Sequence, residues 1–143
     1  GAARVAVWNR SAERARAIAE DLGVEAAGDP APADVLVNCT SVGLDDRTDP
    51  FKDLPLDADA LTAWPTVVDL VYRPGGTALV TAAAARGCET VDGLEVLVHQ
   101  GALSFAVWTG QSAPLDAMRR AARAAEDHPL DDPGAPEPPA SRR

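Results

Sequence analysis

The sequence predicts an α/β protein with a doubly wound, mostly parallel sheet. Short apolar runs rich in β-branched residues alternate along the chain with helical segments of about ten residues or more, as in βαβ units. Polar or glycine-containing loops follow the expected strands at the carboxyl ends, where parallel sheets bind ligands. These loops cover residues 9–11, 38–43, 72–76 and 92–93.

The first expected unit is a strand, a helix and a second short strand. Residues 5–8 form a short apolar run near the start of the chain. Residues 12–22 have apolar side chains at helical spacing, with Ser11 in the N-cap position and Gly23 where a C′ glycine belongs. Residues 24–27 are expected to form the second strand.

The alternation continues through the rest of the chain. Residues 35–37 form a continuous apolar run typical of a strand buried on both faces. The acidic stretch 44–59 is expected to be a solvated loop, with a short helix over 56–64. The remaining expected elements are strands over 66–72 and 88–91 and helices over 77–86, 93–108 and 114–126. We therefore predict one domain over residues 1–126, followed by a disordered Pro- and Asp-rich tail over 127–143.

Composition and charge exclude several classes of function. The chain has 22 acidic and 13 basic residues, a net charge of −9, which disfavours binding to nucleic acid or to anionic membranes. No apolar run approaches the roughly 20 residues that span a bilayer. Cys39 and Cys88 lie far apart, without metal-ligand spacing or a secreted disulfide pattern. We expect a reduced, cytoplasmic protein without a metal site.

Two arginines flank the start of the first expected helix. In dinucleotide-binding folds an acidic residue after the second strand binds the ribose 2′-hydroxyl, whereas an arginine there accommodates a 2′-phosphate. Here Asn9 and Arg10 stand in place of the acid, and Ser11 and Arg14 follow. A guanidinium suits phosphate because its donors form two parallel hydrogen bonds. The commoner explanation of such a motif alone is a solvated helix start with weak Glu–Arg pairs.

Further candidates lie in the other loops at the strand ends. The loop 38–43 has polar side chains ahead of a glycine, but an ordinary Asx or ST turn has the same composition. Tyr72 ends a strand at the ligand edge or is simply an amphipathic rim residue. Gly93 starts a helix where a ligand could approach closely, or is a plain turn glycine. Gln100 could reach a substrate hydroxyl or be an exposed helical glutamine, and His99 is expected on the surface.

Four motifs occur in one order along the chain. They are Asn-Arg-Ser-x-x-Arg after a strand, Val-Asn-Cys-Thr-Ser-Val-Gly, Asp-Leu-Val-Tyr-x-Pro-x-x-Thr, and Asp-Gly-Leu-x-x-Leu-Val-x-Gln-x-Ala-x-x-Phe-x-x-Trp-x-Gly. Over about residues 3–125 the chain resembles the C-terminal, NADP-binding domain of shikimate dehydrogenase. The last two motifs are quite specific to that family.

The resemblance implies an oxidoreductase that reduces 3-dehydroshikimate to shikimate with NADPH, on the route to chorismate and the aromatic amino acids. The residues it implies for NADP binding are Asn9, Arg10, Ser11, Arg14, Thr40, Ser41, Leu70 and Gly93. The first four would bind the adenosine 2′-phosphate, and the others would lie around the nicotinamide half. The residues it implies for substrate binding are Tyr72 and Gln100.

The chain also departs from the family pattern. The family's catalytic lysine and its partner aspartate belong to a separate N-terminal substrate domain, which is missing here; Lys52 matches no catalytic position and Val96 replaces a frequent methionine. The glycine-rich loop and first strand expected before Arg4 are missing too. The resemblance therefore predicts a truncated Rossmann-like sheet with two open strand edges, marginal stability, weak NADP(H) binding and no catalytic residue or activity in this chain alone.

Two other functions remain open on the sequence. One is a free-standing, non-catalytic module that binds a nucleotide or a partner chain, which the absent lysine favours. The other is a related dehydrogenase acting on quinate. Arg10 favours NADP over NAD, and NAD use is commoner among the quinate-acting relatives.

Overall fold

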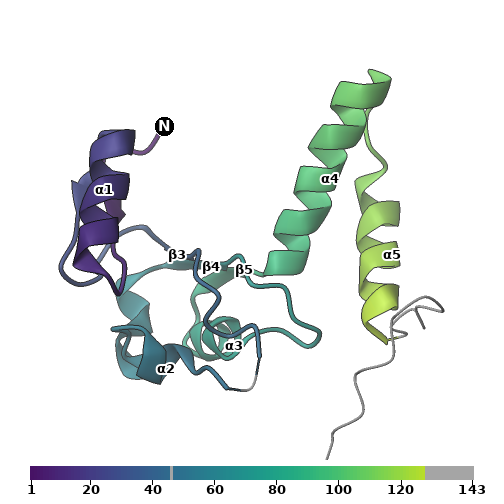
Figure 1. Cartoon of the computed structure of the whole chain (residues 1–143). Coiled ribbons are helices and arrows are strands. Elements are labelled where there is room, and N and C mark those ends of the chain that lie inside the picture. The colour runs from purple at the N-terminus through teal and green to yellow at the C-terminus, as the bar shows by residue number, and fades with distance from the viewer. Residues whose placement is uncertain (46, 128–143) are drawn as a thin grey trace, which may run out of the picture.

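A computed structural model describes residues 1–45 and 47–127 of the protein (Figure 1). The strands are β1 (Ala6–Val7), β2 (Glu25–Ala26), β3 (Val35–Asn38), β4 (Thr66–Asp69) and β5 (Glu89–Val91). The helices are α1 (Ala12–Leu22), α2 (Pro50–Asp53), α3 (Ala78–Ala85), α4 (Gly93–Thr109) and α5 (Leu115–Asp127), together with the 3₁₀ helix η1 (Ala58–Ala63). The expected tail lies outside the described residues except for Asp127, which ends α5. None of the described helices is long and apolar enough to cross a membrane.

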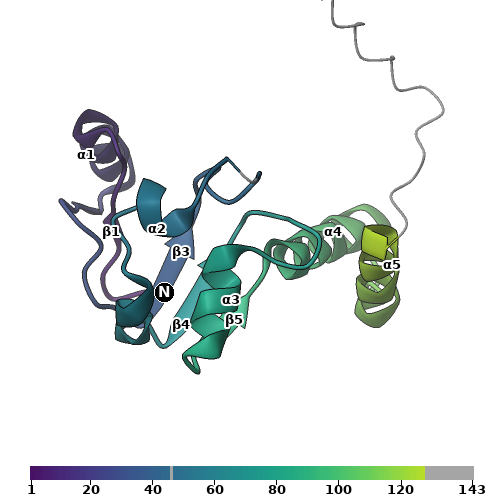
Figure 2. The ribbon, with the colours of Figure 1, turned by 90° about the horizontal axis from the view of Figure 1, so that it is seen from below.

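The strands form two separate parallel sheets. One has the order β1-β2, with Ala6 opposite Glu25, and the other has the order β3-β4-β5, with Asn38 opposite Asp69. This parallel α/β arrangement confirms the predicted fold class. In the described part of the chain, one edge of β1 and one edge of β3 have no hydrogen-bonded neighbour. In Figure 2, β1 lies beside α1 and apart from β4 and β5.

Local sequence signals set the ends of the helices. Ser11 caps α1, since its hydroxyl accepts a hydrogen bond from the Arg14 backbone N–H. Gly23 ends the same helix with φ = 66°, a left-handed conformation that glycine adopts without steric cost. Thr77 and Asp92 cap α3 and α4 in the same way as Ser11. All four boundaries agree with the sequence prediction.

The hydrophobic core lies on one face of the larger sheet, beneath α3 and η1. Its buried members are Leu56, Leu61, Trp64, Val67, Leu79 and Ala83. The Trp64 indole Nε1 donates a hydrogen bond of 2.9 Å to the Ala31 carbonyl, which ties the β2–β3 connection to this core.

The acidic stretch 44–59 was expected to be a plain loop, and this is wrong for the four residues of α2. Asp49 caps α2 by accepting a hydrogen bond of 2.9 Å from the Phe51 backbone N–H, and the buried Pro50 occupies the first turn. A capping aspartate followed by proline is a helix-start signal. The expected short helix over 56–64 is present as η1.

The opposite face of the larger sheet is poorly covered. Val35 and Val37 of β3 are 48% and 47% exposed, so the expectation of a strand buried on both faces is wrong. The physical reason is that α2, η1 and α3 form the layer on one face only. As Figure 1 shows, α4 instead leads away from the β5 edge and packs along α5.

Charge and close packing join α4 to α5. The Arg119 Nε donates hydrogen bonds of 2.8 and 3.0 Å to the two carboxylate oxygens of Glu95. Arg119 lowers the pKa of Glu95 through this hydrogen bonding, with Coulombic contributions from His99 and Arg123 as well. These contacts fix α5 against the first turns of α4.

Candidate functional site

A buried carboxylate joins the segments that leave β3 and β4. Asp69 is fully buried at the end of β4. One of its oxygens, Oδ1, accepts hydrogen bonds of 2.9 Å from Asn38 Nδ2 and 3.0 Å from the Val71 backbone N–H. The other oxygen accepts a 2.6 Å hydrogen bond from the Thr77 hydroxyl. Sequence reasoning did not select Asp69, although an acidic residue ending an apolar strand in the third motif was a usable signal.

The loop 38–43 folds around the Asn38 side chain. Asn38 Oδ1 accepts hydrogen bonds of 3.0 Å from the Thr40 backbone N–H and 2.7 Å from the Thr40 hydroxyl. The Thr40 hydroxyl oxygen in turn accepts a 3.1 Å hydrogen bond from the Val42 backbone N–H. The loop is therefore an Asx- and ST-type turn in this structure. Thr40 is half-buried in it and Ser41 is exposed, so Ser41 is the member of the predicted pair with the freer access to a ligand.

Gly93 is held against the segment that follows β4. A Cβ atom at this position would lie 2.4 Å from the Val71 carbonyl oxygen and 2.7 Å from the Tyr72 backbone nitrogen. The space left by the absent side chain is thus filled by the protein's own backbone. The first turn of α4 and the 71–72 segment consequently form one packed unit. Contact between Gly93 and the cofactor stays a prediction.

Three of the predicted nicotinamide-side and substrate-side residues, Leu70, Tyr72 and Gly93, belong to this unit or adjoin it. Leu70 and Tyr72 are 44% and 37% exposed on either side of the buried Val71. Gln100 is exposed and lies seven residues after Gly93 in α4, close to two full turns, so both residues share one helix face. His99 is exposed, as expected, with Nε2 at 3.5 Å from a Glu95 carboxylate oxygen.

The predicted phosphate-binding group belongs to the other sheet. Asn9, Arg10 and Ser11 follow β1, and α1 packs on β1 and β2. Asn9 Oδ1 accepts a 2.9 Å hydrogen bond from the Ser11 backbone N–H, which sets the turn into α1. Arg10 and Arg14 are exposed, and neither forms an ion pair within residues 1–45 and 47–127. Two guanidinium groups are thus available beside the N-terminus of α1.

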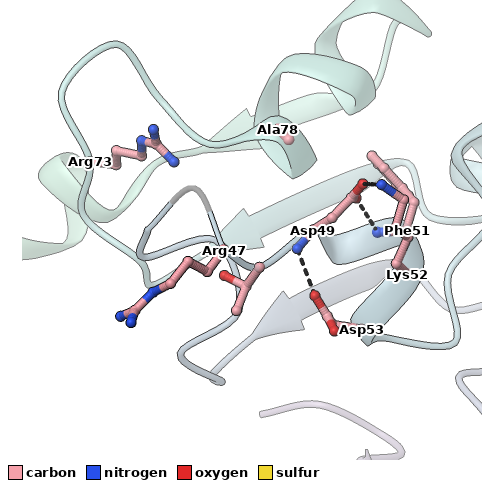
Figure 3. A pocket seen from close by; sticks show the side chains of 8 residues that line it. Arg47, Asp49, Phe51, Lys52, Asp53, Arg73 and Ala78 are labelled. Carbon is pink, nitrogen blue, oxygen red and sulfur yellow. Dashed lines mark hydrogen bonds and ion pairs between the residues drawn. The ribbon is translucent and has the colours of Figure 1, made fainter.

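An open depression of about 540 Å³ lies elsewhere, between α2 and the start of α3 (Figure 3). It contains none of the predicted site residues. Asp49 Oδ2 lies 3.1 Å from Lys52 Nζ within its lining. Lys52 and the Phe51 backbone N–H both lower the pKa of Asp49, with the backbone hydrogen bond the larger cause. Lys52 is therefore an ion-paired surface residue.

The architecture defines a class of protein before any comparison is made. Parallel strands alternate with helices, polar loops follow the carboxyl ends of β3 and β4, and arginines flank the start of α1. These are features of Rossmann-like domains. Among the described residues no cluster of His, Cys, Asp or Glu could hold a metal ion.

Comparison with known proteins shows which proteins the chain is similar to. The model of the shikimate 5′-dehydrogenase C-terminal domain matches residues 93–123, which cover α4 and most of α5. A shikimate dehydrogenase (NADP(+)) of Halorubrum lacusprofundi is 44% identical over 129 residues, which cover 85% of this chain and 46% of the relative. These matches show that the chain is similar in sequence to the C-terminal domain of shikimate dehydrogenases.

Solved structures agree with this similarity. The crystal structure of shikimate 5-dehydrogenase from Thermus thermophilus in complex with NADP(H) and shikimate is 42% identical, with a TM-score of 0.69, over 85% of this chain and 46% of that one. The ligand-free 5-ketofructose reductase of a Gluconobacter strain is 30% identical, with a TM-score of 0.74, over 87% of this chain and 48% of that one. The chain thus spans about half the length of the proteins it matches.

Proposed function

We propose that the chain is the NADP-binding portion of a shikimate dehydrogenase, which reduces 3-dehydroshikimate to shikimate with NADPH. The observation that carries the proposal is the pair of exposed guanidinium groups of Arg10 and Arg14 beside the N-terminus of α1. A helix N-terminus and arginine side chains both favour a phosphate group. The names of the Halorubrum and Thermus relatives support NADP as the dinucleotide.

The two groups of residues would bind opposite ends of this cofactor. Asn9, Arg10, Ser11 and Arg14 would bind the adenosine 2′-phosphate. The residues that would surround the nicotinamide end and the substrate are Thr40, Ser41, Leu70, Tyr72, Gly93 and Gln100. NADPH, when bound, would supply the hydride, and the residues of this chain would orient the ring and exclude water from it.

We also propose that this chain alone does not catalyse the reaction. Reduction of a ketone to an alcohol requires a proton donor beside the carbonyl oxygen. The single lysine, Lys52, is paired with Asp49 in a depression that contains no predicted site residue. His99 faces Glu95 on an exposed helix surface. Neither Lys52 nor His99 is among the predicted substrate-binding residues, which supports the proposal that a separate substrate domain supplies the proton donor.

Adenosine 2′,5′-bisphosphate and adenosine 5′-monophosphate test the proposed phosphate site, since they differ only in the 2′-phosphate. We expect an NMR titration of the chain to show tighter binding of the bisphosphate, with the largest amide shifts at residues 9–14. Arg10→Ala should weaken it by about tenfold or more, because charge-assisted hydrogen bonds are lost. Arg16→Ala, another exposed arginine of α1, is the matched control and should have little effect.

Equal binding of the two nucleotides, or equal effects of the two arginine substitutions, would overturn the proposal of an NADP site. Equal nucleotide binding would instead favour a general nucleotide-binding module. Oxidation of NADPH by the chain with 3-dehydroshikimate, followed at 340 nm, would overturn the proposal that the chain alone is inactive.

A further inference from the structure

We propose that Asp69 is the positioning residue of the candidate site, holding the loop 38–43 and the segment 70–72 in a fixed relation. The inference rests on the proposed function only in one respect, namely that the loop 38–43 and the segment 70–72 bind the cofactor and the substrate. The geometry that carries it is the meeting of three chain segments at one buried carboxylate.

Asp69 is an unusual core residue because neutral donors satisfy its carboxylate. It is 0% exposed, and none of the ion pairs in the described part of the chain includes it. A buried carboxylate is costly unless hydrogen-bond donors satisfy its oxygens. Here the donors are Asn38 Nδ2, the Val71 backbone N–H and the Thr77 hydroxyl.

Only an acceptor-only side chain suits these three donors. An asparagine at position 69 would offer one oxygen and a donating amide group. Its amide would face the Thr77 hydroxyl, whose oxygen already accepts a 3.3 Å hydrogen bond from the Val80 backbone N–H. The Thr77 hydroxyl proton would then lose its acceptor. The ionised carboxylate therefore explains the whole arrangement, whereas the isosteric amide does not.

The bonds of Asp69 extend to both candidate loops. Through Asn38, the carboxylate orients the side-chain oxygen that holds the Thr40 backbone N–H and hydroxyl. Through its own hydrogen bond to Val71, it fixes the backbone that lies against Gly93. The Leu70 backbone N–H also donates a 3.0 Å hydrogen bond to the Asn38 carbonyl, which links the two segments directly.

The titration of the Cys39 thiol is a second measurement that responds to the charge of Asp69. Its thiol lies in the loop next to Asn38, and partial burial followed by the negative charge of Asp69 raises its pKa. Removal of that charge without a change of shape should therefore change the titration of the thiol as well as the loop.

Amide hydrogen exchange of the 143-residue chain, without ligand, tests the proposal. We expect Asp69→Asn to accelerate exchange at Thr40, Val42 and Val71 by about tenfold or more relative to the strand amides of β4, because hydrogen bonds to a charged acceptor are lost. Val67→Ala removes part of a buried side chain of the same strand without touching the network and is the matched control. It should accelerate exchange throughout the sheet, without a preference for the loops.

Thr77 supplies a second pair of variants if Asp69→Asn does not fold. Thr77→Val removes the donor hydroxyl and should loosen Val71, whereas Thr77→Ser retains the hydroxyl and should preserve its protection. Loop exchange in Asp69→Asn no faster than in Val67→Ala, or equal protection in the two Thr77 variants, would overturn the positioning role. Because no ligand is present, this result does not depend on whether the chain binds NADPH; failure of the nucleotide titration alone would refute only the proposed function.

Discussion

Gly93→Ala tests the packing of the 71–72 segment on α4 directly. The added Cβ would lie 2.4 Å from the Val71 carbonyl oxygen, 2.5 Å from the Val71 carbonyl carbon and 2.7 Å from the Tyr72 nitrogen. Ordinary carbon–oxygen contacts are about 3.3 Å or longer. The backbone must therefore separate by close to an ångström, and no side-chain rotation can relieve the contact because all three atoms belong to the main chain.

The expected cost follows from two opposing effects. Overpacking of this kind destabilises proteins by about 1–3 kcal/mol. Alanine is the better helix former, by up to about 1 kcal/mol in a helix interior and less in the first turn. The packing effect should dominate, so we expect Gly93→Ala to lower the free energy of unfolding by roughly 1–2 kcal/mol.

Gly101→Ala is the matched control within the same helix. Its added Cβ would meet only the terminal methyl carbon of Met118, at 3.2 Å, which a flexible side chain can move away. Urea denaturation followed by circular dichroism at 222 nm compares the two variants. Gly101→Ala should be neutral or slightly stabilising. If Gly93→Ala proved as stable as Gly101→Ala, the inferred contact between α4 and the 71–72 segment would be refuted.

Three further predictions concern the whole chain, one thiol and one ion pair. Thermal unfolding of the chain should be broad and shift little with NADPH, because the edges of β1 and β3 are open among the described residues and no glycine-rich loop is expected to cradle the pyrophosphate; a sharp transition that NADPH raises strongly would contradict this. Alkylation of Cys39, followed by mass spectrometry, should have its pH midpoint above the ordinary thiol range, and Asp69→Asn should lower that midpoint. Because folding raises the pKa of the Cys39 thiol, the contribution of this thiol to folding stability is fully present below the thiol pKa of the unfolded chain and is lost as the pH rises through the folded pKa. An alkylation midpoint that Asp69→Asn leaves unchanged would refute the charge effect. Folding lowers the pKa of Glu95, so the contribution of its ion pair to folding stability is present above the ordinary carboxyl pKa and is lost as the pH falls. Amide exchange in α5 should therefore accelerate on acidification sooner than amide exchange in α3. Glu95→Gln should abolish this difference, whereas Asp116→Asn, which removes the more exposed partner of Arg119, should largely retain it.

The parts of the fold that local chemistry determines were predictable from the sequence. A capping side chain contacts backbone two or three residues away, so Ser11, Thr77 and Asp92 could be placed at helix starts without knowledge of the tertiary structure. The left-handed Gly23 is a local signal of the same kind. The parallel sheet followed from the order of these elements.

Long-range partners explain what could not be predicted. Burial of Val35 and Val37 depends on which layer covers the second face of the sheet, and a run of apolar residues does not contain that information. Asp69 and Asn38 are 31 residues apart in the sequence, so the residues around either side chain do not predict their hydrogen bond. For Gly93 the need for close approach was predictable, but the approaching atoms turned out to be those of the Val71–Tyr72 backbone.

The division of the strands between two sheets gives a physical reason for weak cofactor binding by this chain. The predicted phosphate group follows β1, while the predicted nicotinamide group follows β3 and β4, and no strand ladder joins β1 to β3 among the described residues. A dinucleotide that bound both groups would have to fix their relative position, and part of its binding free energy would be lost in that ordering. A strand that hydrogen-bonded to both open edges would impose this order beforehand. The bisphosphate, which requires only the β1 side, should therefore retain more of its intrinsic affinity than intact NADPH.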